Sequence, residues 1–263
     1  MAELLLDIAG LPTAIVSRDP RVIRLAEDRY AGFLADGEPA WRITVDDRPC
    51  PLQPGEDVVV ARDGRERLDV RRYDFQATLD LGSRRGDVAF AELDEYALDS
   101  FLRVLYSLTL IAAGGLLVHA ANVGRDGRAY VFPGPSGSGK TTVTRLSPES
   151  TLLSDEIAAV RTGPQGGIAY GTPFWGELAK AGANEALPVA GIYFLHQAQA
   201  HAARGLRRPE AILGVLSNVL FFARDPALTA RLLDVAAELV ASVPCFRLDF
   251  RRDPGFWEVI THD

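Results

Sequence analysis

The feature that most constrains this chain is a glycine-rich segment, GPSGSGKT, at residues 134–141. It matches the pattern G-x-x-x-x-G-K-[ST] at every fixed position and follows an apolar run, RAYVFP. Gly134, Gly137 and Gly139 allow positive φ angles and bring main-chain N–H groups close to an anion, and the helix expected next adds its positive end. The segment therefore predicts a strand, a phosphate-binding loop and a helix in an α/β domain.

The residues of this loop have separate expected roles. Lys140 is expected to reach the β- and γ-phosphates of ATP or another nucleoside triphosphate, and the Thr141 hydroxyl is expected to bind Mg²⁺. The 28 Lys and Arg residues include only two lysines, Lys140 and Lys180. A chance glycine-rich turn is the alternative, but a rare lysine stands where phosphate binding needs it. The expected nucleotide-binding residues are Gly134, Pro135, Ser136, Gly137, Ser138, Gly139, Lys140, Thr141 and Thr142.

A second element is the pair Asp155 and Glu156, which follows the apolar run TLLS. Carboxylate oxygens at a strand end beside a phosphate-binding loop are suited to hold Mg²⁺. The alternative is a hydrophilic pair of the kind that often ends a strand. Asp155 follows Lys140 by 15 residues, which leaves room for a helix and a strand but for no inserted domain. The metal set expected from the sequence is therefore Thr141, Asp155 and Glu156.

Motifs of two other classes of nucleotide-binding protein are absent from the sequence. There is no LSGGQ signature of transport ATPases. The N-K-x-D base-recognition motif of GTPases is excluded because neither lysine follows an asparagine. Motor and switch functions are therefore disfavoured relative to group transfer.

His119 lies in the run GLLVHAANV, which GRDGR joins to the run that leads into the loop. Two apolar runs with a short Asp-Gly connection are typical of a β-hairpin. Such a hairpin would place the imidazole near the phosphates, where it could orient a phosphate or assist proton transfer. A histidine that only packs within a strand is the alternative.

Taken together, these residues carry a resemblance to a known family. LLVHAANVGRDGRAYVFPGPSGSGKTTVTRL, with the later LLSDEIAAV, resembles the catalytic core of the HPr kinase/phosphorylase family, which is related to phosphoenolpyruvate carboxykinase. The resemblance covers residues 115–160 and implies a P-loop kinase core that uses ATP and Mg²⁺. It also implies that Asp155 is the base for the attacking hydroxyl, that Glu156 helps with the metal, and that His119 and Lys140 belong to the catalytic set.

The chain departs from the HPr kinases at three points, the first of which is that its first 90 residues show no match to the N-terminal domain of those proteins. Asp155-Glu156 stands where those proteins have Asp-Asp, and their downstream glycine-rich signature is missing. The phosphate acceptor is therefore left open as a hydroxyl of a protein, a peptide or a small molecule. The corresponding region contains GTPFWGE at 171–177, whose Phe174 and Trp175 either close over a base or substrate or fill the core.

The rest of the sequence predicts an α/β fold in two parts. Residues 1–93 are expected to form a smaller α+β unit that faces a substrate or partner, and residues 94–263 the P-loop nucleotide-binding, kinase-like domain. Strands are expected at 4–16, 41–45, 57–61, 67–81, 87–91, 115–123, 128–133, 151–155, 156–161, 191–195 and 245–250, and helices at 21–34, 95–115, 140–146, 209–223, 226–242 and 254–260.

Composition limits the partners. The formal charge of −7 argues against nucleic acid or an anionic membrane surface as a partner. The longest uncharged run, residues 104–118, is shorter than the roughly 20 residues that a membrane-spanning helix needs. Cys50 and Cys245 lie far apart with no CxxC motif, which suits a reducing cytoplasm. We therefore expect a cytoplasmic protein, and the family resemblance leaves a homo-oligomer open.

The leading hypothesis is an ATP- and Mg²⁺-dependent phosphotransferase that moves the γ-phosphate to a hydroxyl. One alternative is a nucleotide-binding regulatory or assembly protein without turnover. Another is a small-molecule P-loop kinase of the nucleoside or shikimate type, for which HAARGLRRPE at 201–210 would have to supply an arginine-bearing lid.

Overall fold

The chain folds into two compact units, which we describe separately. The computed structural model describes residues 1–52, 55, 57–163 and 166–260. The first unit comprises Met1–Thr109 and Phe221–Thr229, and the second comprises Leu110–Leu220 and the chain from Ala230 onward. Each unit combines a mixed sheet with helices, which confirms the expected α/β class.

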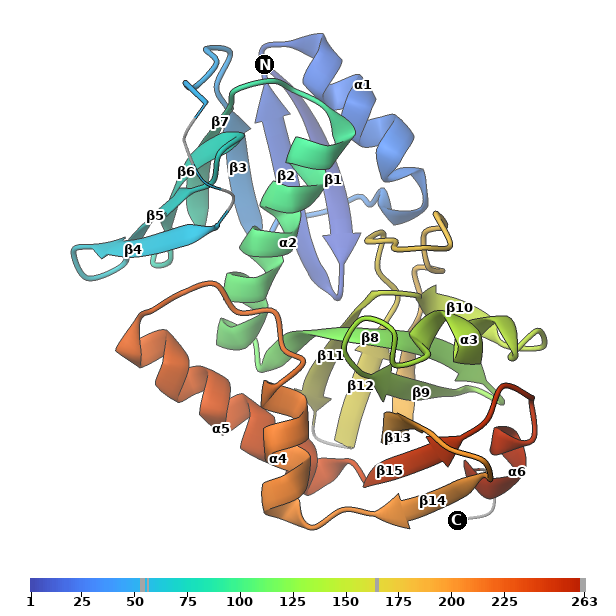
Figure 1. The fold of residues 1–263 in the computed structure, drawn as a ribbon. Helices are drawn as coiled ribbons and strands as arrows, with labels where there is room; N and C mark the ends of the chain where they lie inside the picture. The colour runs from blue at the N-terminus through green and yellow to red at the C-terminus, as the bar shows by residue number, and fades with distance from the viewer. Residues whose placement is uncertain (53–54, 56, 164–165, 261–263) are drawn as a thin grey trace. The chain divides into compact units, whose positions relative to one another are not determined.

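The first unit is built on a seven-stranded sheet in the order β1-β2-β3-β7-β6-β5-β4 (Figure 1). The β2–β3 and β3–β7 pairs are parallel, and the remaining pairs are antiparallel. The elements that begin in this part of the chain are β1 (Ala2–Ile8), β2 (Leu11–Ser17), α1 (Pro20–Arg29), the 3₁₀ turn η1 (Ala31–Phe33), β3 (Trp41–Val45), β4 (Val59–Asp63), β5 (Arg67–Arg71), β6 (Phe75–Asp80), β7 (Arg85–Phe90) and α2 (Glu95–Ala112).

The N-terminal run expected as one strand at 4–16 is a β-hairpin of β1 and β2. Its turn residues Ala9 and Gly10 have φ angles of 58° and 67°. Two consecutive positive φ angles are typical of the tight turn whose twist matches that of a hairpin. The sequence conceals this turn because alanine seldom adopts a positive φ. The strand expected at 67–81 is also two strands, β5 and β6.

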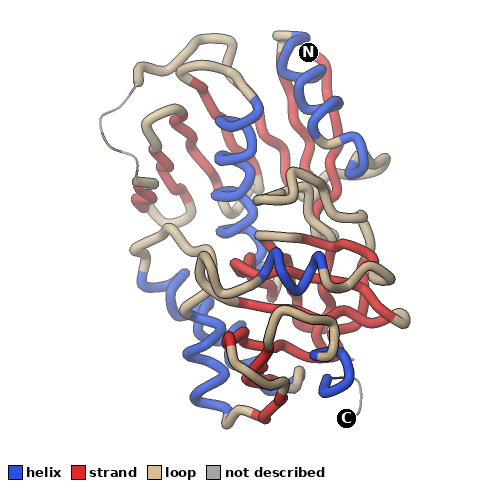
Figure 2. Tube along the Cα trace, turned by 45° about the vertical axis from the view of Figure 1, so that its right-hand side comes forward, coloured by secondary structure: helices blue, strands red, loops and turns tan. Residues whose placement is uncertain are grey.

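Helix α2 packs on the strands of the first unit through aromatic side chains. Phe101 makes edge-to-face contacts with Phe75 of β6 and Phe90 of β7, at 5.6 and 6.1 Å between ring centroids. Asp99, also on α2, accepts a hydrogen bond of 2.8 Å from Arg29 of α1. Figure 2 shows α2 beside the strands of this sheet.

The division between the units falls inside α2. The first unit takes α2 up to Thr109, and it also contains the later segment 221–229. This segment contacts β4, where Arg62 donates a hydrogen bond of 2.9 Å to Asp225. The division expected at residues 93 and 94 would separate both α2 and this segment from the strands that they contact.

The second unit is built on an eight-stranded sheet that runs β10-β8-β11-β12-β13-β15-β14, with β9 paired to β8 and β13. The expected hairpin of β8 and β9 is confirmed. The elements that begin here or later are β8 (Gly115–Arg125), β9 (Arg128–Pro133), α3 (Lys140–Arg145), β10 (Thr151–Ser154), β11 (Ile157–Gly163), β12 (Gly166–Tyr170), β13 (Ala186–Gln197), β14 (Ala202–Gly205), α4 (Arg208–Leu216), α5 (Pro226–Ser242), β15 (Cys245–Phe250) and α6 (Phe256–Ile260).

Three neighbouring strands of this sheet, β9, β13 and β15, run parallel. The carboxyl ends of parallel strands meet at one edge of a sheet, and ligands of α/β proteins bind outside that edge. The glycine-rich segment follows β9 at this edge. The topology therefore brings the ends of β13 and β15 to the loop, although they lie far from it in sequence.

The core of the second unit fixes the position of α3. Val143 of α3 is buried in one cluster with Phe132 of β9, Phe250 of β15 and Trp257 of α6. The Trp257 indole donates a hydrogen bond of 3.0 Å to Ser147 Oγ, just beyond α3. A six-residue helix is too short to be stable alone, so this packing holds it in place.

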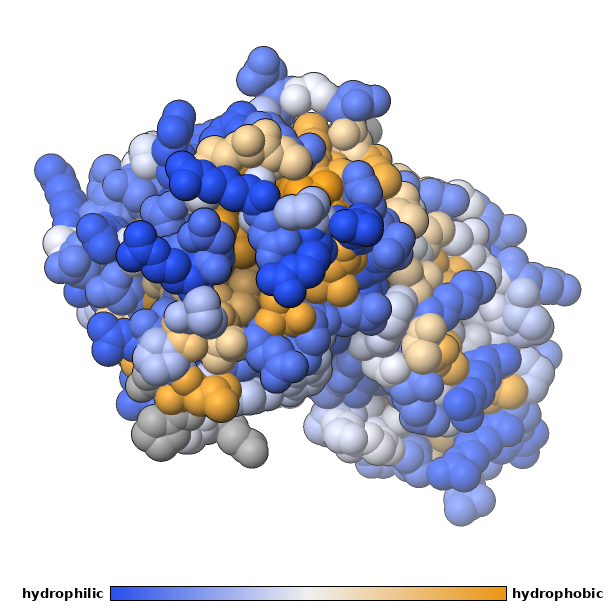
Figure 3. Space-filling model, turned by 90° about the horizontal axis from the view of Figure 1, so that it is seen from above, coloured by the Kyte–Doolittle hydropathy of each residue, from blue (hydrophilic) through white to orange (hydrophobic). Residues whose placement is uncertain are grey.

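Hydrophilic side chains predominate on the face of the molecule that Figure 3 shows, with smaller apolar areas between them. Within the described ranges, we find no helix with the length and apolar character needed to cross a membrane.

Candidate nucleotide-binding site

The glycine-rich segment forms a loop between β9 and α3, as its motif requires. Gly137 and Gly139 have φ angles of 78° and 113°, in the region that favours glycine. A Cβ on Gly139 would also lie 2.4 Å from the Phe250 ring, and a Cβ on Gly134 would lie 2.3 Å from Ser138 Oγ. The three glycines are therefore needed for backbone angle or for close packing.

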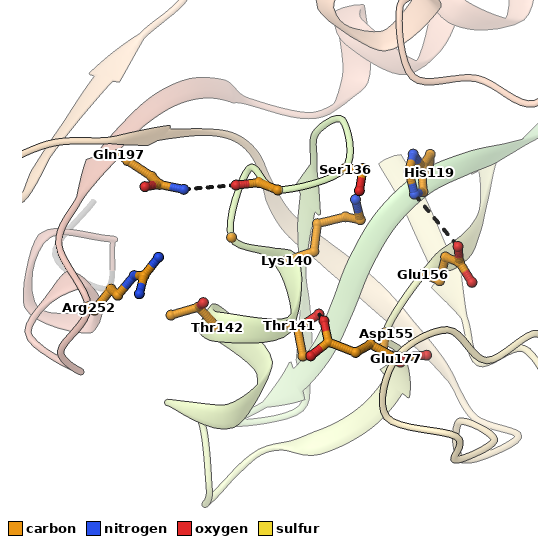
Figure 4. Close-up of a pocket in the computed structure, with 12 residues that line it drawn as sticks. His119, Ser136, Lys140, Thr141, Thr142, Asp155, Glu156, Glu177, Gln197 and Arg252 are labelled. Carbon is orange, nitrogen blue, oxygen red and sulfur yellow. Dashed lines mark hydrogen bonds and ion pairs between the residues drawn. The ribbon is translucent and has the colours of Figure 1, made fainter.

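Lys140 lies buried at the start of α3 and points back along the loop (Figure 4). Its Nζ donates hydrogen bonds to Gly134 O at 2.9 Å and to Pro135 O at 3.1 Å. Burial lowers the pKa of the ammonium, and the negative charge of Glu156 opposes this effect. The ammonium is therefore held by neutral carbonyls at the position where phosphate oxygens are expected.

A cleft of about 260 Å³ opens beside the loop. It brings together most of the site residues that the sequence predicted. Gly134, Pro135 and Ser138 do not line it, and Glu177, Gln197 and Arg252 join it unpredicted. The cleft is lined by His119, Ser136, Gly137, Gly139, Lys140, Thr141, Thr142, Asp155, Glu156, Glu177, Gln197 and Arg252.

Main-chain hydrogen bonds hold His119 between the loop and the acidic pair. The His119 carbonyl accepts the N–H of Gly134 at 3.3 Å, and Ala120 N donates to the Glu156 carbonyl at 2.9 Å. His119 Nε2 then lies 3.9 Å from Glu156 Oε1, with both side chains about one-third exposed. The imidazole and this carboxylate therefore face the cleft as a pair.

Asp155 is directed differently from Glu156. Its side chain is buried, and its two oxygens accept the N–H groups of Gly176 at 2.9 Å and Leu178 at 2.8 Å. Asp155 therefore anchors the segment that follows β12. A Cβ on Gly176 would lie 2.7 Å from Glu156 Oε2, so the same segment also packs directly on Glu156.

Glu177 is the acidic residue that sequence reasoning gave no role. Its Oε2 accepts a hydrogen bond of 3.0 Å from Thr141 Oγ1 (Figure 4). Its Oε1 lies 3.2 Å from Arg145 NH2. Its place in GTPFWGE gave little signal, because the loop is irregular and Thr141 lies 36 residues earlier in the chain.

Gln197 and Arg252 lie at the cleft because β9, β13 and β15 run parallel and end at the same edge of the sheet. Gln197 ends β13 and donates a hydrogen bond of 2.8 Å to Gly137 O, and Arg252 lies just past β15. A neighbouring cavity of about 320 Å³ continues past Thr142. It shares four residues with the cleft and adds Gln199 among others. The cavity is lined by Gly139, Thr142, Gln197, Ala198, Gln199, Phe250, Arg251 and Arg252.

Other side chains that the sequence left open lie elsewhere. Phe174 is fully buried and so fills the core, whereas Trp175 is half-buried. The segment HAARGLRRPE forms β14 and the start of α4, where Arg207 pairs with Glu210 at 2.6 Å. These arginines do not line the cleft.

The described side chains do not form a complete metal site on their own. Within those residues there is no group of three or more His, Cys, Asp or Glu side chains that could hold a metal ion. Mg²⁺ usually keeps several water ligands and binds one or two carboxylates together with substrate phosphates. The contact of Thr141 with Glu177 fits such a shared site.

Comparison with known families gives a match over more than half of the chain. The model of a family described as SynChlorMet cassette protein ScmC matches residues 93–262. The chain belongs to the ScmC family. All the residues that line the cleft of this ScmC-family chain, from His119 to Arg252, lie inside the matched range. No match was found among curated proteins.

Proposed function

We propose that this chain is an ATP- and Mg²⁺-dependent phosphotransferase with an HPr kinase-like P-loop core, which moves the γ-phosphate to a hydroxyl of a protein, a peptide or a small molecule. The observation that carries the proposal is one cleft in which Lys140 and Thr141 lie beside His119 and Glu156. The first pair suits a triphosphate, and the second suits the proton of an attacking hydroxyl. A site that only holds nucleotide needs no second pair.

Phosphoryl transfer depends on positioning and charge stabilisation. The acceptor oxygen attacks the γ-phosphorus, the bond from this phosphorus to the β–γ bridging oxygen breaks, and the hydroxyl proton passes to a carboxylate. Lys140 would exchange the Gly134 and Pro135 carbonyls for β- and γ-phosphate oxygens. Mg²⁺, when bound, neutralises charge on the phosphates.

We assign the acceptor proton to Glu156, because its carboxylate is partly exposed and lies near the imidazole of His119. Asp155, the base that the family resemblance implies, is buried and already accepts two main-chain hydrogen bonds. Its assignment as base stays a prediction, and comparison of the Asp155→Asn, Glu156→Gln and Glu177→Gln variants separates the two assignments.

The two cavities suggest an orientation for the nucleotide. In a P-loop the lysine and the threonine act at the β- and γ-phosphates. The nucleoside would then lie at the far end, past Thr142, in the cavity that contains Gln199 and Arg252. The acceptor would enter from the side of His119 and Glu156.

The test combines nucleotide binding with label transfer. Titration calorimetry compares Mg-ATP binding by the wild-type chain and by Lys140→Ala. [γ-³²P]ATP is then incubated with peptides that contain Ser, Thr and Tyr, with small hydroxyl compounds, and with water as the only acceptor. We expect Lys140→Ala to lose binding. Glu156→Gln should keep binding and slow transfer by about 10²- to 10⁴-fold.

Three results would change this account. A wild-type chain that binds neither ATP nor GTP would contradict it. Tight Mg-ATP binding with no transfer to any of these acceptors would favour the regulatory or assembly alternative. If Asp155→Asn abolished transfer while Glu156→Gln and Glu177→Gln both transferred normally, the base would be Asp155.

A further inference from the structure

The segment 171–183, which follows β12, is held tightly against the end of β10. Thr172 N donates to Leu153 O at 3.0 Å, and Ala183 N donates to Leu152 O at 2.8 Å. A Cβ on Gly182 would lie 1.8 Å from Leu153 O, so only glycine fits this approach. The segment has no helix or strand, but its main chain is fixed by hydrogen bonds and close packing.

Asp155 holds the centre of this segment. Its two carboxylate oxygens accept the N–H groups of Gly176 and Leu178, the residues on either side of Glu177. Hydrogen bonds to a carboxylate are shorter and stronger than those between neutral groups. The main chain of Glu177 is therefore clamped on both sides, and the clamp sets where its side chain can reach.

The side chain of Glu177 reaches Thr141, the residue whose hydroxyl the loop motif offers to Mg²⁺. The two oxygens are 3.0 Å apart. Neighbouring ligands of an octahedral Mg²⁺, with bonds of about 2.1 Å at right angles, also lie about 3.0 Å apart. The contact therefore already has the spacing that one shared cation requires.

We propose that Glu177 binds Mg²⁺ together with Thr141, and that Asp155 is a positioning residue that acts through Glu177. The inference rests on the proposed function, because nucleotide phosphates and water would complete the coordination. It differs from the metal set expected from the sequence, which joined Asp155 and Glu156 to Thr141. One carboxylate and one hydroxyl are within the range of protein ligands that Mg²⁺ uses in phosphate sites.

The test separates metal binding from nucleotide binding. Titration calorimetry gives the Kd of ATP in excess Mg²⁺ and in EDTA, and the ratio of the two values measures the effect of the metal. Glu177→Gln should reduce this ratio by about tenfold or more and leave the affinity in EDTA unchanged. Glu185→Gln is the matched control, because it removes the same charge from an exposed position close by in the chain and should keep the wild-type ratio.

A second measurement does not depend on ATP affinity or turnover. With Mn²⁺ in place of Mg²⁺, electron paramagnetic resonance reports the Mn²⁺ bound with ADP, and Glu177→Gln should release it. Asp155→Asn should reduce the metal effect in the same way. Because Asp155 acts through Glu177, the double variant should be no worse than Glu177→Gln alone.

The possible failures can be told apart. If the wild-type chain binds ATP and Mg²⁺ strengthens that binding, an unchanged ratio in Glu177→Gln overturns the assignment of Glu177. Fully additive losses in the double variant overturn the positioning role of Asp155. If the wild-type chain binds no nucleotide in excess Mg²⁺ or in EDTA, the proposed function is contradicted, and so is the assignment of Glu177.

Discussion

At the scale of single residues, Lys140 carries a buried charge whose two hydrogen-bond partners are neutral carbonyls. Neutral carbonyls replace only part of the solvation that a buried charge loses, and its pKa is lowered by that burial. A triphosphate would supply the missing negative charge.

The lowered pKa of Lys140 predicts a pH dependence with a definite sign. The unfolded chain holds this proton more tightly than the folded chain, so between the two pKa values the contribution of Lys140 to stability rises with pH. A bound triphosphate raises the pKa again, and ATP binding should therefore take up protons in that range. Titration calorimetry in buffers of different ionisation enthalpy should show more proton uptake at pH 9 than at pH 7.

The two lysines of the chain provide the control for this measurement. Lys180→Arg, at an exposed position, should keep the extra uptake at pH 9. Lys140→Arg should lose it, because arginine stays protonated throughout this range. Equal uptake at both pH values in the wild-type chain would argue against the role given to Lys140.

The sequence predicted those site residues whose chemistry belongs to a local motif. The loop residues, His119 and the acidic pair could be found because each lies at a fixed distance from Lys140 along the chain. Gln197 and Arg252 could not, because their place depends on the parallel order of β9, β13 and β15. The sequence also could not show that the carboxylate of Asp155, although it lines the cleft, bonds the main chain on either side of Glu177.

At the scale of elements, hydrophobic periodicity predicted strands and helices well where polar residues separate them. In the strand expected at 41–45, Trp41, Ile43 and Val45 are buried and alternate with the half-buried Arg42 and Thr44. The expected single strand at 4–16 was wrong, because Ala9 and Gly10 form a turn inside this apolar run and divide it into β1 and β2. Hydrophobic periodicity also missed β14, whose short run AARG carries no such alternation.

Asp225, the residue before helix α5, makes two kinds of contact. Asp225 accepts a hydrogen bond from Leu228 N at 2.8 Å, which caps the helix before Pro226, and it pairs with Arg62 of β4. The hydrogen bond from the Arg62 side chain lowers the pKa of Asp225 from 3.8 to about 2. A depressed carboxyl pKa contributes stability above the unfolded value, and this stability is lost as the pH falls from about 4 to about 2.

We therefore predict that Asp225→Asn lowers the free energy of unfolding at pH 7 by about 2 kcal/mol. The loss should shrink as the pH falls through the range in which the wild-type carboxyl is protonated. Urea unfolding at several pH values measures this difference. Asp234→Asn, at an exposed position on the same helix, is the matched control and should have little effect. A pH-independent loss of stability in Asp225→Asn would mean that the charge of Asp225 is not the cause. Because asparagine can also cap a helix, the loss would then come from disturbed packing.

At the scale of the whole molecule, the chain passes between its two compact units more than once. It leaves the first unit inside α2, returns for residues 221–229, and leaves again within α5. The second unit holds all the residues of the cleft. In the first unit, Phe75 and Phe90 of the sheet bury Phe101 of α2.

This arrangement predicts that a fragment of residues 94–263 does not fold well alone. Such a fragment would expose Phe101 and its apolar neighbours on α2, and it would leave Asp225 without Arg62. We expect aggregation in size-exclusion chromatography and a broad urea transition, whereas the full chain should be monodisperse and cooperative. A fragment that is monomeric and unfolds cooperatively would show that α2 and residues 221–229 need no partner from the first unit.

The return of residues 221–229 to the first unit limits how this protein could be recombined. The family match begins at residue 93, so the N-terminal part before it is the segment that such a recombination would replace. A replacement for the N-terminal part would have to cover the apolar side of α2. It would also need a strand with a basic side chain that pairs with Asp225. An exchange at a single position of the chain would therefore fail. The N-terminal part and residues 221–229 would have to be exchanged together.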